Sequence, residues 1–460
     1  MKMKKILPIF VACLLLFTTA CKNENVKTKE NNETKLTIHK YPERIKTSII
    51  YEVNIRQYTP EGTFNAFVEH IPRLKELGVE ILWIMPIHPV GEKNRKGTLG
   101  SYYAVKDYKA VNPEFGTEED FANLIKVAHE NNMLIILDWV ANHTAWDNPW
   151  TKANPEWYTQ DEEGNIIAPV DDWSDVADLN YDNKEMRAAM IDALKYWVSE
   201  FDVDGYRCDV AMMVPTDFWN EARAELDKVK PVFMLAEAED ELDLFEKAFD
   251  MRYAWELLHL TENVAKGEKN ANDLIEYFER NQKKYEQRML KMPFTSNHDE
   301  NSWNGTVFER YPDCHKTFAV FTYVIPGMPL IYSGQEACLD KQLEFFEKDE
   351  IEWKTCNMTE LYTSLATLKI QNEALWNGEF GGIMEIVEIK ENEKIFSFVR
   401  EKNDNKVLVI FNFSDTETEI KINDEKAFGT YAEYFSHTEI EISKEETYKL
   451  DPWAYWILIK

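Results

Sequence analysis

Four acidic residues follow short runs that are typical of buried strands: Asp138, Asp209, Glu237 and Asp299. Arg207 lies two residues before Asp209, so on a strand the two side chains point to the same side. In a barrel of parallel strands, the carboxyl ends of the strands meet at one face, where enzymes of this architecture form their active sites. We therefore expect these carboxylates to converge over one mouth.

A converging pair of carboxylates suits hydrolysis of a glycosidic bond with retention of configuration. That reaction needs a nucleophilic carboxylate and an acid/base carboxyl about 5 to 5.5 Å apart, which neighbouring barrel strands can supply. Asp209 fits the nucleophile because the Arg207 cation favours its ionised form. Glu237 fits the acid/base because the apolar residues 233–236 before it raise a carboxyl pKa. A solvated or capping carboxylate is the alternative for any one acid, but four in register argue against it.

Two histidines follow strand ends in the same way. His143 comes five residues after Asp138, and His298 immediately precedes Asp299. A histidine whose hydrogen bonds are purely structural is the commoner case in general. The position after a barrel strand favours a role in the site for both.

The elements that must position these residues alternate between strand-like and helix-like segments. Apolar residues recur on one helical face in segments such as 64–77 and 186–198, and a third helix begins at Thr117 with Asp120 in a capping-box-like start. The strand-like runs are residues 48–53, 80–85, 134–138, 203–209, 232–236, 248–251, 292–296 and 329–333. Eight alternations predict an α/β fold, a (β/α)8 TIM barrel over residues 48–376, with an open doubly wound sheet as the alternative.

Two segments depart from this alternation. Residues 145–182, after the third strand, are rich in Trp, Asp, Asn and Pro and have no helical period, so we predict a small inserted domain. Over residues 377–460 the pattern changes to short alternating strands, which predict a C-terminal antiparallel β-sandwich. The strands expected there are residues 383–390, 395–400, 407–413, 417–422, 431–435 and 453–459.

The first 21 residues have the pattern of a targeting segment. A basic start precedes the apolar stretch 6–20, which is too short to span a bilayer as a mature helix. The sequence LFTTAC, ending at Cys21, resembles the lipobox of bacterial lipoproteins, whose cysteine is lipidated. Residues 22–47 are expected to form a tether and lead-in. We expect an exported protein, lipid-anchored in the bacterial cell envelope at the outer membrane; an ordinary signal peptide is the alternative.

Composition argues against some partners. The 460 residues include 82 Asp and Glu against 52 Lys and Arg, a formal net charge of −30, which disfavours nucleic acid and leaves the lipid anchor as the only expected contact with a membrane. A neutral substrate fits better, and we expect a monomer. Beyond the first 21 residues the cysteines are Cys208, Cys314, Cys338 and Cys356. They are too few for a disulfide framework, and the sequence does not decide whether any pair is bonded.

The motifs also carry a family resemblance. Five segments, in order, resemble the signature regions of the α-amylase family, glycoside hydrolase family 13. They are DWVANHT (138–144), ADLN (177–180), GYRCD (205–209), the Glu237 segment and TSNHD (295–299). The resemblance extends from about residue 48 to the carboxyl end. Five motifs in the right order are specific, whereas any single one would be weak.

The resemblance implies a role for each acid. Asp209 would be the nucleophile and Glu237 the acid/base. Asp299 would be the third carboxylate, which in the family binds ring hydroxyls and favours a distorted, oxocarbenium-like sugar. Arg207 would orient Asp209, and Asp138 would support the arrangement.

The resemblance also implies sugar contacts. His143 and His298 would hydrogen-bond hydroxyls of the sugar at the cleavage point, and Tyr103 would stack beneath that sugar. Trp303, just past the seventh-strand motif, is a further candidate contact. The tryptophans of the inserted domain could stack on outer sugars or form the small core of that domain.

One departure from the family pattern bears on metal. Members that bind the conserved calcium usually have Lys-His at the end of the second signature region, where this chain has Met212–Met213. Asn142 is retained as a candidate ligand, and Asp171, Asp172 and Asp175 offer hard oxygens. The chemistry requires no cofactor, and the departure weakens the expectation of a structural calcium.

Together these features predict a retaining α-glucoside hydrolase that acts on α-1,4-glucans or maltooligosaccharides through a covalent glycosyl-enzyme intermediate. A transglycosylase or an α-1,6-acting member of the family is the alternative. A non-catalytic surface protein that captures starch is less favoured. Such a protein should have lost a catalytic carboxylate, and Asp209, Glu237 and Asp299 are all present.

Overall fold

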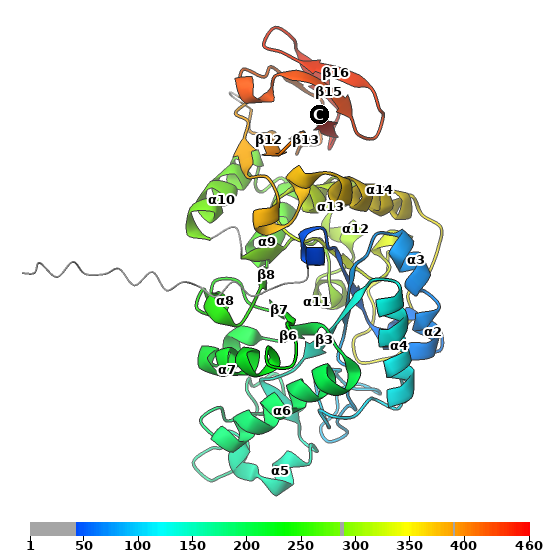
Figure 1. Cartoon of the computed structure of the whole chain (residues 1–460), viewed down its shortest axis with the longest axis vertical. Helices are drawn as coiled ribbons and strands as arrows, with labels where there is room; N and C mark the ends of the chain where they lie inside the picture. Colours follow the sequence, from blue (N-terminus) through cyan, green and yellow to red (C-terminus); the bar gives the residue numbers. More distant parts are fainter. Residues whose placement is uncertain (1–42, 286–288, 390–391) are drawn as a thin grey trace, which may run out of the picture. The chain divides into compact units, whose positions relative to one another are not determined.

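The computed structural model describes residues 43–285, 289–389 and 392–460. Eight parallel strands form one sheet in the order β10-β1-β2-β3-β6-β7-β8-β9. They are β1 (Ile50–Val53), β2 (Ile81–Ile84), β3 (Leu134–Trp139), β6 (Gly205–Cys208), β7 (Phe233–Ala236), β8 (Met251–Tyr253), β9 (Leu290–Met292) and β10 (Leu330–Tyr332). Figure 1 shows the labelled strands β3, β6, β7 and β8 with helices around them. Backbone N–H groups of Met328 and Leu330 donate to the carbonyls of Lys291 and Pro293, which joins the two edges of the sheet. The prediction of a (β/α)8 barrel is confirmed.

Two barrel strands lie beside, rather than on, the predicted apolar runs. β8 begins where the predicted run ended, and β9 ends where the predicted run began. Each contains a cation under an aromatic ring: the Arg252 guanidinium lies 3.5 Å from the Tyr285 ring centre, and Lys291 Nζ lies 4.7 Å from that of Tyr277. A charged residue interrupts an apolar run in the sequence, but a cation covered by a ring can still belong to a buried strand. The apolar runs therefore predict the wrong bounds for these two strands.

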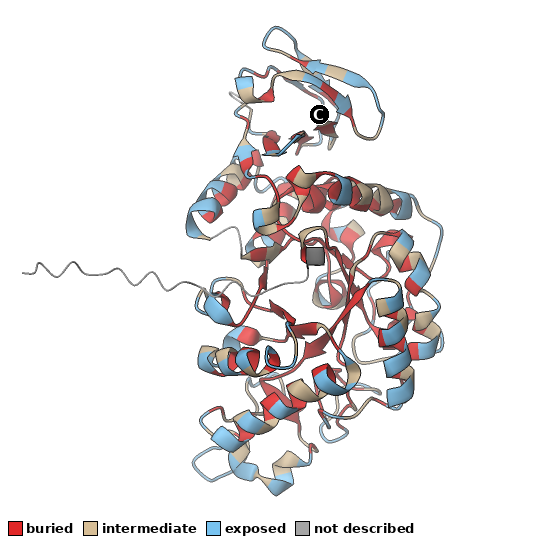
Figure 2. Cartoon of the chain, in the orientation of Figure 1, coloured by how far each residue is buried: buried red, intermediate tan, exposed pale blue. Residues whose placement is uncertain are grey.

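The helices cover the outside of the barrel and turn their apolar faces to it. Figure 2 shows buried residues along the barrel strands and exposed residues on the outer faces of helices such as α4 and α6. The helices of this part of the chain are α1 (Ile55–Tyr58), α2 (Phe64–Val68), α3 (Ile71–Glu76), α4 (Glu118–Glu130), α6 (Lys184–Phe201), α7 (Thr216–Leu226), α8 (Leu244–Lys247), α9 (Trp255–Ala265), α10 (Ala271–Lys284), α11 (His298–Trp303), α12 (Val307–Arg310), α13 (His315–Val324) and α14 (Asn357–Gln371).

Local signals in the sequence account for two of the helix boundaries. Thr117 and Asp120 form the predicted capping box at the start of α4. The predicted helix over 64–77 is two helices, α2 and α3, because Pro72 lies in the first turn of α3, where a proline starts a helix but cannot continue one.

The inserted segment forms a small hairpin. Strands β4 (His143–Ala145) and β5 (Val176–Asp178) pair antiparallel, with α5 (Trp150–Ala153) between them in sequence. That single helical turn was not predicted. The hairpin starts at His143, so the insertion directly continues the segment that follows β3.

The C-terminal part is antiparallel, as predicted, and consists of two sheets. Their orders are β11-β12-β13-β18-β15-β16 and β14-β17. The strands are β11 (Met384–Ile386), β12 (Ile395–Lys402), β13 (Asn405–Asn412), β14 (Thr418–Ile420), β15 (Gly429–Glu433), β16 (Glu439–Ile442), β17 (Tyr448–Leu450) and β18 (Tyr455–Ile459). β16 and β17 were not predicted because each is short, four and three residues, and gives little room for an alternating pattern. Arg400 joins this part to the barrel by donating to the carbonyls of Val324 and Ile325.

Four cysteines lie in the described part of the chain. Cys338 and Cys356 form a disulfide, whereas Cys208 and Cys314 are buried free thiols. In the described parts of the chain, no helix has the length and apolar character needed to cross a membrane. Cys21 lies outside the described residues.

Candidate active site

The predicted site residues lie at the carboxyl ends of the barrel strands. Arg207 belongs to β6, and Asp209 follows that strand directly. Glu237 is the first residue after β7, and Asp299 lies in the first turn of α11. Tyr103 comes from the long segment between β2 and α4. Parallel strands deliver all of these side chains to one face because their carboxyl ends share it.

These side chains surround a cavity of about 600 Å³. Among its lining residues are seven that the sequence predicted: Tyr103, His143, Asp209, Glu237, His298, Asp299 and Trp303. The cavity is also lined by residues that were not predicted, including Lys96, Phe345 and Phe346. The three predicted carboxylates and the two predicted histidines therefore meet around one opening, which Asp172 and Asp175 also line.

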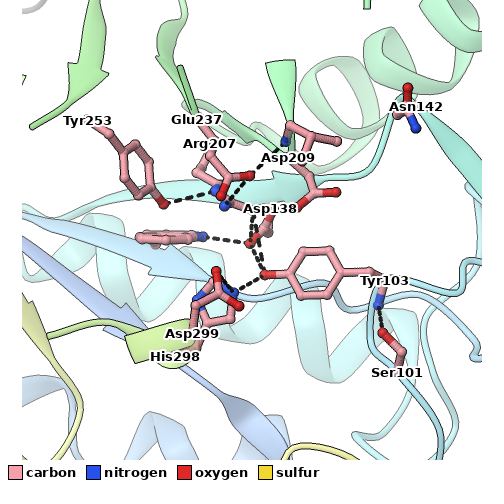
Figure 3. Close-up of polar contacts among 12 residues, drawn as sticks. Ser101, Tyr103, Asp138, Asn142, Arg207, Asp209, Glu237, Tyr253, His298 and Asp299 are labelled. Atoms are coloured by element: carbon pink, nitrogen blue, oxygen red, sulfur yellow. Dashed lines mark hydrogen bonds and ion pairs between the residues drawn. The ribbon is translucent and has the colours of Figure 1, made fainter. Parts of the chain in front are cut away.

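Arg207 lies beneath the cavity and is fully buried. Its Nη1 donates to Asp138 Oδ1 at 2.9 Å and to Asp209 Oδ1 at 3.0 Å, while Nη2 lies 2.8 Å from Glu237 Oε2. Figure 3 shows the guanidinium among these carboxylates, with the Tyr253 hydroxyl on its other side. One cation therefore holds the two candidate catalytic acids and Asp138 together.

The protonation of the two acids follows from burial and from this shared cation. Burial raises the pKa of Asp209 well above its usual range, and Arg207 only partly opposes the effect. Burial likewise raises the pKa of Glu237, again against Arg207. The sequence predicted a raised pKa for Glu237 but an ionised Asp209, because it did not count how many carboxylates share Arg207. A close pair with raised pKa values favours holding one proton between its members, as a retaining glycosidase requires.

Glu52, in β1, is a site residue that the sequence analysis missed. It is fully buried, and its Oε1 accepts a hydrogen bond from His298 Nδ1 at 2.5 Å. The only available signal was an acid inside the otherwise apolar run of a strand, residues 50–53. A buried carboxylate needs a partner, and His298 supplies it.

His298 is held as a cation by its contacts. The Tyr103 hydroxyl donates its hydrogen to Asp138 Oδ2 at 2.9 Å, so its oxygen accepts from His298 Nε2 at 2.8 Å. Because Nδ1 also donates, both ring nitrogens carry hydrogen. Burial by itself would lower the pKa of His298, but the charges of Asp299 and Glu52 raise it to about 9. The imidazolium lies 3.3 Å from Asp299 Oδ2 and balances its charge.

His143 differs from His298 in its charge. Burial lowers its pKa to about 4, so the ring is neutral at physiological pH. The Asn142 side-chain amide lies 3.2 Å from His143 Nδ1. A neutral ring can still exchange a hydrogen bond with a sugar hydroxyl without attracting an anion.

The predicted calcium ligands do not form a metal site. Lys96 Nζ donates to the Asp172 carbonyl at 2.6 Å and lies 3.1 Å from Asp175 Oδ1, so an ammonium occupies the position between these oxygens. In Figure 3 no polar contact joins Asn142 to the catalytic candidates Asp209, Glu237 and Asp299. Within residues 43–285, 289–389 and 392–460, no group of three or more His, Cys, Asp or Glu side chains is arranged to hold a metal ion. These residues do not fit calcium, which needs six to eight oxygens.

A TIM barrel with paired, buried carboxylates at the carboxyl ends of its strands is the arrangement of a glycosidase. The family model for the α-amylase catalytic domain matches residues 27–165 and 157–373, and the model for the maltogenic amylase C-terminal domain matches residues 384–457. The chain therefore belongs to the α-amylase family, glycoside hydrolase family 13, and is an enzyme of that family.

Individual relatives agree with this assignment. The crystal structure of an α-amylase from Lactobacillus plantarum is 31% identical, with a TM-score of 0.82 over 91% of this chain and 99% of that one. That of a maltogenic α-amylase from Thermotoga neapolitana is 31% identical, with a TM-score of 0.83 over 90% of this chain and 99% of that one. An α-1,4-glucan:maltose-1-phosphate maltosyltransferase from Picrophilus torridus is 27% identical over 397 residues, 76% of this chain and 58% of that protein. The family chemistry needs no cofactor.

Proposed function

We propose that this enzyme hydrolyses α-1,4-glucosidic bonds in glucans or maltooligosaccharides with retention of configuration. The observation that carries the proposal is the contact of one buried arginine, Arg207, with both Asp209 and Glu237 at the floor of an open cavity. The cavity wall combines aromatic faces with hydrogen-bonding groups, which suits a neutral sugar. The relatives named as amylases support the choice of an α-glucan.

In the proposed mechanism, the proton shared by the pair resides on Glu237 when substrate is bound. Glu237 gives this proton to the glycosidic oxygen while Asp209 attacks the anomeric carbon, and the bond to the leaving sugar breaks. Glu237, now a carboxylate, removes a proton from water, which attacks the same carbon and releases Asp209. Two inversions return the α configuration.

The remaining residues bind and orient the sugar. Asp299 accepts hydrogen bonds from ring hydroxyls, and the His298 cation lies beside that carboxylate. Tyr103 offers its ring as the platform under the sugar, and its hydroxyl is tied to Asp138. His143 contacts the same sugar as a neutral partner, and Trp303 contacts a neighbouring one.

Transfer to a sugar is the second candidate function. The covalent intermediate is the same, but a sugar hydroxyl intercepts it in place of water. The similarity to a maltosyltransferase favours keeping transfer in the test. Cleavage of an α-1,6 bond in place of an α-1,4 bond is a further alternative.

The test is a time course with maltoheptaose, with products separated by chromatography and the anomer followed by proton NMR in the first minutes. We expect shorter maltooligosaccharides with the α anomer first. Products longer than maltoheptaose would establish transfer, and a β anomer first would overturn the retaining mechanism. The Asp209→Asn variant is the control, and activity within tenfold of the parent would exclude Asp209 as the nucleophile.

We also propose that the protein is an exported lipoprotein that works as a monomer. The support is the LFTTAC sequence, with Cys21 as the lipidated residue, in front of a polar tether. The acyl chains would be its contact with the envelope membrane, since a surface with net charge −30 does not attract anionic lipid.

A further inference from the structure

One wall of the cavity consists of Trp303, already proposed as a sugar contact, and of two phenylalanines that have no role in the proposed mechanism. Phe345 and Phe346 are half-buried and line the cavity, although neither belongs to a recognised motif. The ring centre of Phe345 lies 5.4 Å from that of Trp303. It lies 6.2 Å from that of Tyr103, with the two rings within 12° of parallel. Phe345 therefore places a second aromatic ring, nearly parallel to the proposed sugar platform, beside Tyr103.

Trp303 is unusual on the same wall because it is 56% exposed. It ends α11, the short helix that begins with His298 and Asp299. Its ring lies beside those of Phe345 and Phe346, so the three side chains form a contiguous apolar patch on the cavity, which is a sign of a binding surface. Trp303, on the same helix as Asp299, and the neighbouring Phe345 thus place apolar rings beside the active site.

The loop that carries the two phenylalanines, residues 339–355, is fastened at its ends and in its middle. The disulfide between Cys338 and Cys356 closes it. Asn301, on α11, accepts from the Leu343 N–H at 2.9 Å and donates to the Lys341 carbonyl at 3.0 Å. The loop is therefore hydrogen-bonded to the helix that holds Asp299.

The other side of the loop is attached to the segment that precedes Tyr103. The Leu99 N–H donates to the Phe346 carbonyl at 3.0 Å. Gly97 has φ +62°, and a Cβ there would lie 2.5 Å from the Phe346 Cβ, so this close approach requires glycine. Attachment on two sides sets the position of the aromatic wall relative to both Tyr103 and Asp299.

We propose that Trp303, Phe345 and Phe346 form a stacking subsite for a second sugar ring, adjacent to the ring on Tyr103, and that the disulfide-closed loop 339–355 sets the preference for longer chains. The inference rests on the proposed function, since it concerns the same cavity. Flat aromatic faces contact the apolar face of a sugar without requiring charge, which suits the neutral substrate.

The test compares a long and a one-ring substrate, maltoheptaose and α-glucosyl fluoride, in the full-length protein. Phe345→Ala and Trp303→Ala should each lower the ratio of kcat/KM for maltoheptaose to that for α-glucosyl fluoride by about threefold to tenfold. Phe345→Trp should restore the ratio, because it keeps an aromatic face. Phe308→Ala, which removes a half-buried ring that does not line the cavity, is the matched control and should leave the ratio unchanged.

A double variant, Cys338→Ser with Cys356→Ser, tests the loop. We expect the same ratio to fall, because the wall is then fastened by hydrogen bonds alone. Ratios equal to that of the parent in Phe345→Ala and Trp303→Ala would overturn the subsite, and an unchanged ratio in the double variant would overturn the role of the disulfide.

A binding measurement separates failure of the subsite from failure of the proposed function. In a Glu237→Gln background, calorimetry with maltoheptaose should show weaker binding when Phe345→Ala is added, by about the same factor. If the parent cleaves neither substrate but the added change still weakens binding, the subsite stands and the proposed function fails. If the parent cleaves both and binding is unaffected, the function stands and the subsite fails.

Discussion

At the scale of the residue, the sharing of Arg207 determines how the site holds its protons. A lone aspartate beside an arginine is expected to be ionised. Here three carboxylates, those of Asp138, Asp209 and Glu237, contact the same guanidinium in a buried place. One cation cannot neutralise three anions, so burial dominates and the pKa of both catalytic candidates rises. Burial, against the opposing charge of Arg207, therefore retains the proton that the acid/base must give away.

Substitution of Glu237 should separate the two half-reactions. Glu237→Gln should lower turnover of maltoheptaose by about 10²- to 10⁴-fold, the usual contribution of a general acid. α-Glucosyl fluoride needs no proton to leave, so the variant should release a burst of fluoride and accumulate the glycosyl-enzyme. A fluoride electrode and mass spectrometry of the intact protein would measure both, with Asp209→Asn as the control without burst. Equal loss on both substrates, with no adduct, would contradict the assignment.

Substitution of Glu52 should change the charge of His298. In Glu52→Gln the amide oxygen can still accept from His298 Nδ1, but the negative charge of the carboxylate is lost. The pKa of His298 should therefore fall from about 9. His298 would then lose its proton at a lower pH than in the parent. The basic limb of the pH profile of kcat/KM should therefore shift to lower pH. Histidine NMR with isotope labelling would follow the ring directly, and Glu80→Gln, an acid outside the cavity, is the control. An unshifted ring pKa would contradict the role of Glu52.

At the scale of the element, the inserted hairpin is braced by a lysine. Lys96 comes from the segment before Tyr103, and its contacts with Asp172 and Asp175 connect that segment to the residues just before β5. A half-exposed ion pair of this kind contributes about 0 to 1 kcal/mol. Asp172 and Asp175 are also two of the residues that the sequence offered as calcium ligands. The Lys96 ammonium therefore occupies the position considered for a metal ion.

Chelation should therefore have little effect. We expect EDTA to leave activity unchanged and to shift the melting temperature by less than about 2 °C, less than the change of roughly 2 to 4 °C expected for 1 kcal/mol in a large domain. Lys96→Met should lower the melting temperature by a few degrees at most, with Lys93→Met as the control, and differential scanning calorimetry would measure each. Activity lost with EDTA and restored by calcium would show that Asn142 and the aspartates do form a working metal site.

At the scale of the whole molecule, the chain combines an enzyme with a proposed leader and an acidic composition. The family models match both the barrel and the C-terminal domain, and Arg400 couples the two through buried hydrogen bonds to carbonyls of α13 and the residue that follows it. A buried cation of this kind is costly to leave unpaired, so the two parts are expected to unfold together. The proposed anchor lies at the opposite end of the sequence from the C-terminal domain.

Removal of the proposed lipid site should release the protein from the membrane. Cys21→Ala should convert a detergent-phase, acylated protein into an aqueous-phase one, because covalently attached chains provide the affinity for the bilayer. Detergent phase partition and mass spectrometry would measure the change, and Cys13→Ala, the other cysteine of the leader, is the control. Unchanged membrane partition in Cys21→Ala would contradict the lipoprotein proposal.

The sequence alone determined most of the elements and the order of the acids along the chain, because hydrophobic period and capping act between near neighbours. The eight strands, the Thr117 capping box and the placement of Asp209, Glu237 and Asp299 after strand ends all followed from local pattern. The predicted ranges of β8 and β9 were offset from the observed strands, because each strand contains a cation that packs against an aromatic ring. A local sequence pattern does not show which ring covers a charge.

Only the tertiary structure decided which distant residues touch and how they share charge. Glu52 and His298 are 246 residues apart in sequence yet joined by a hydrogen bond, and nothing in either segment specifies the other. The same holds for Lys96 with Asp175 and for Phe345 beside Trp303. The physical reason is that desolvation and Coulomb interaction depend on distance in space, which the chain acquires only when the barrel closes.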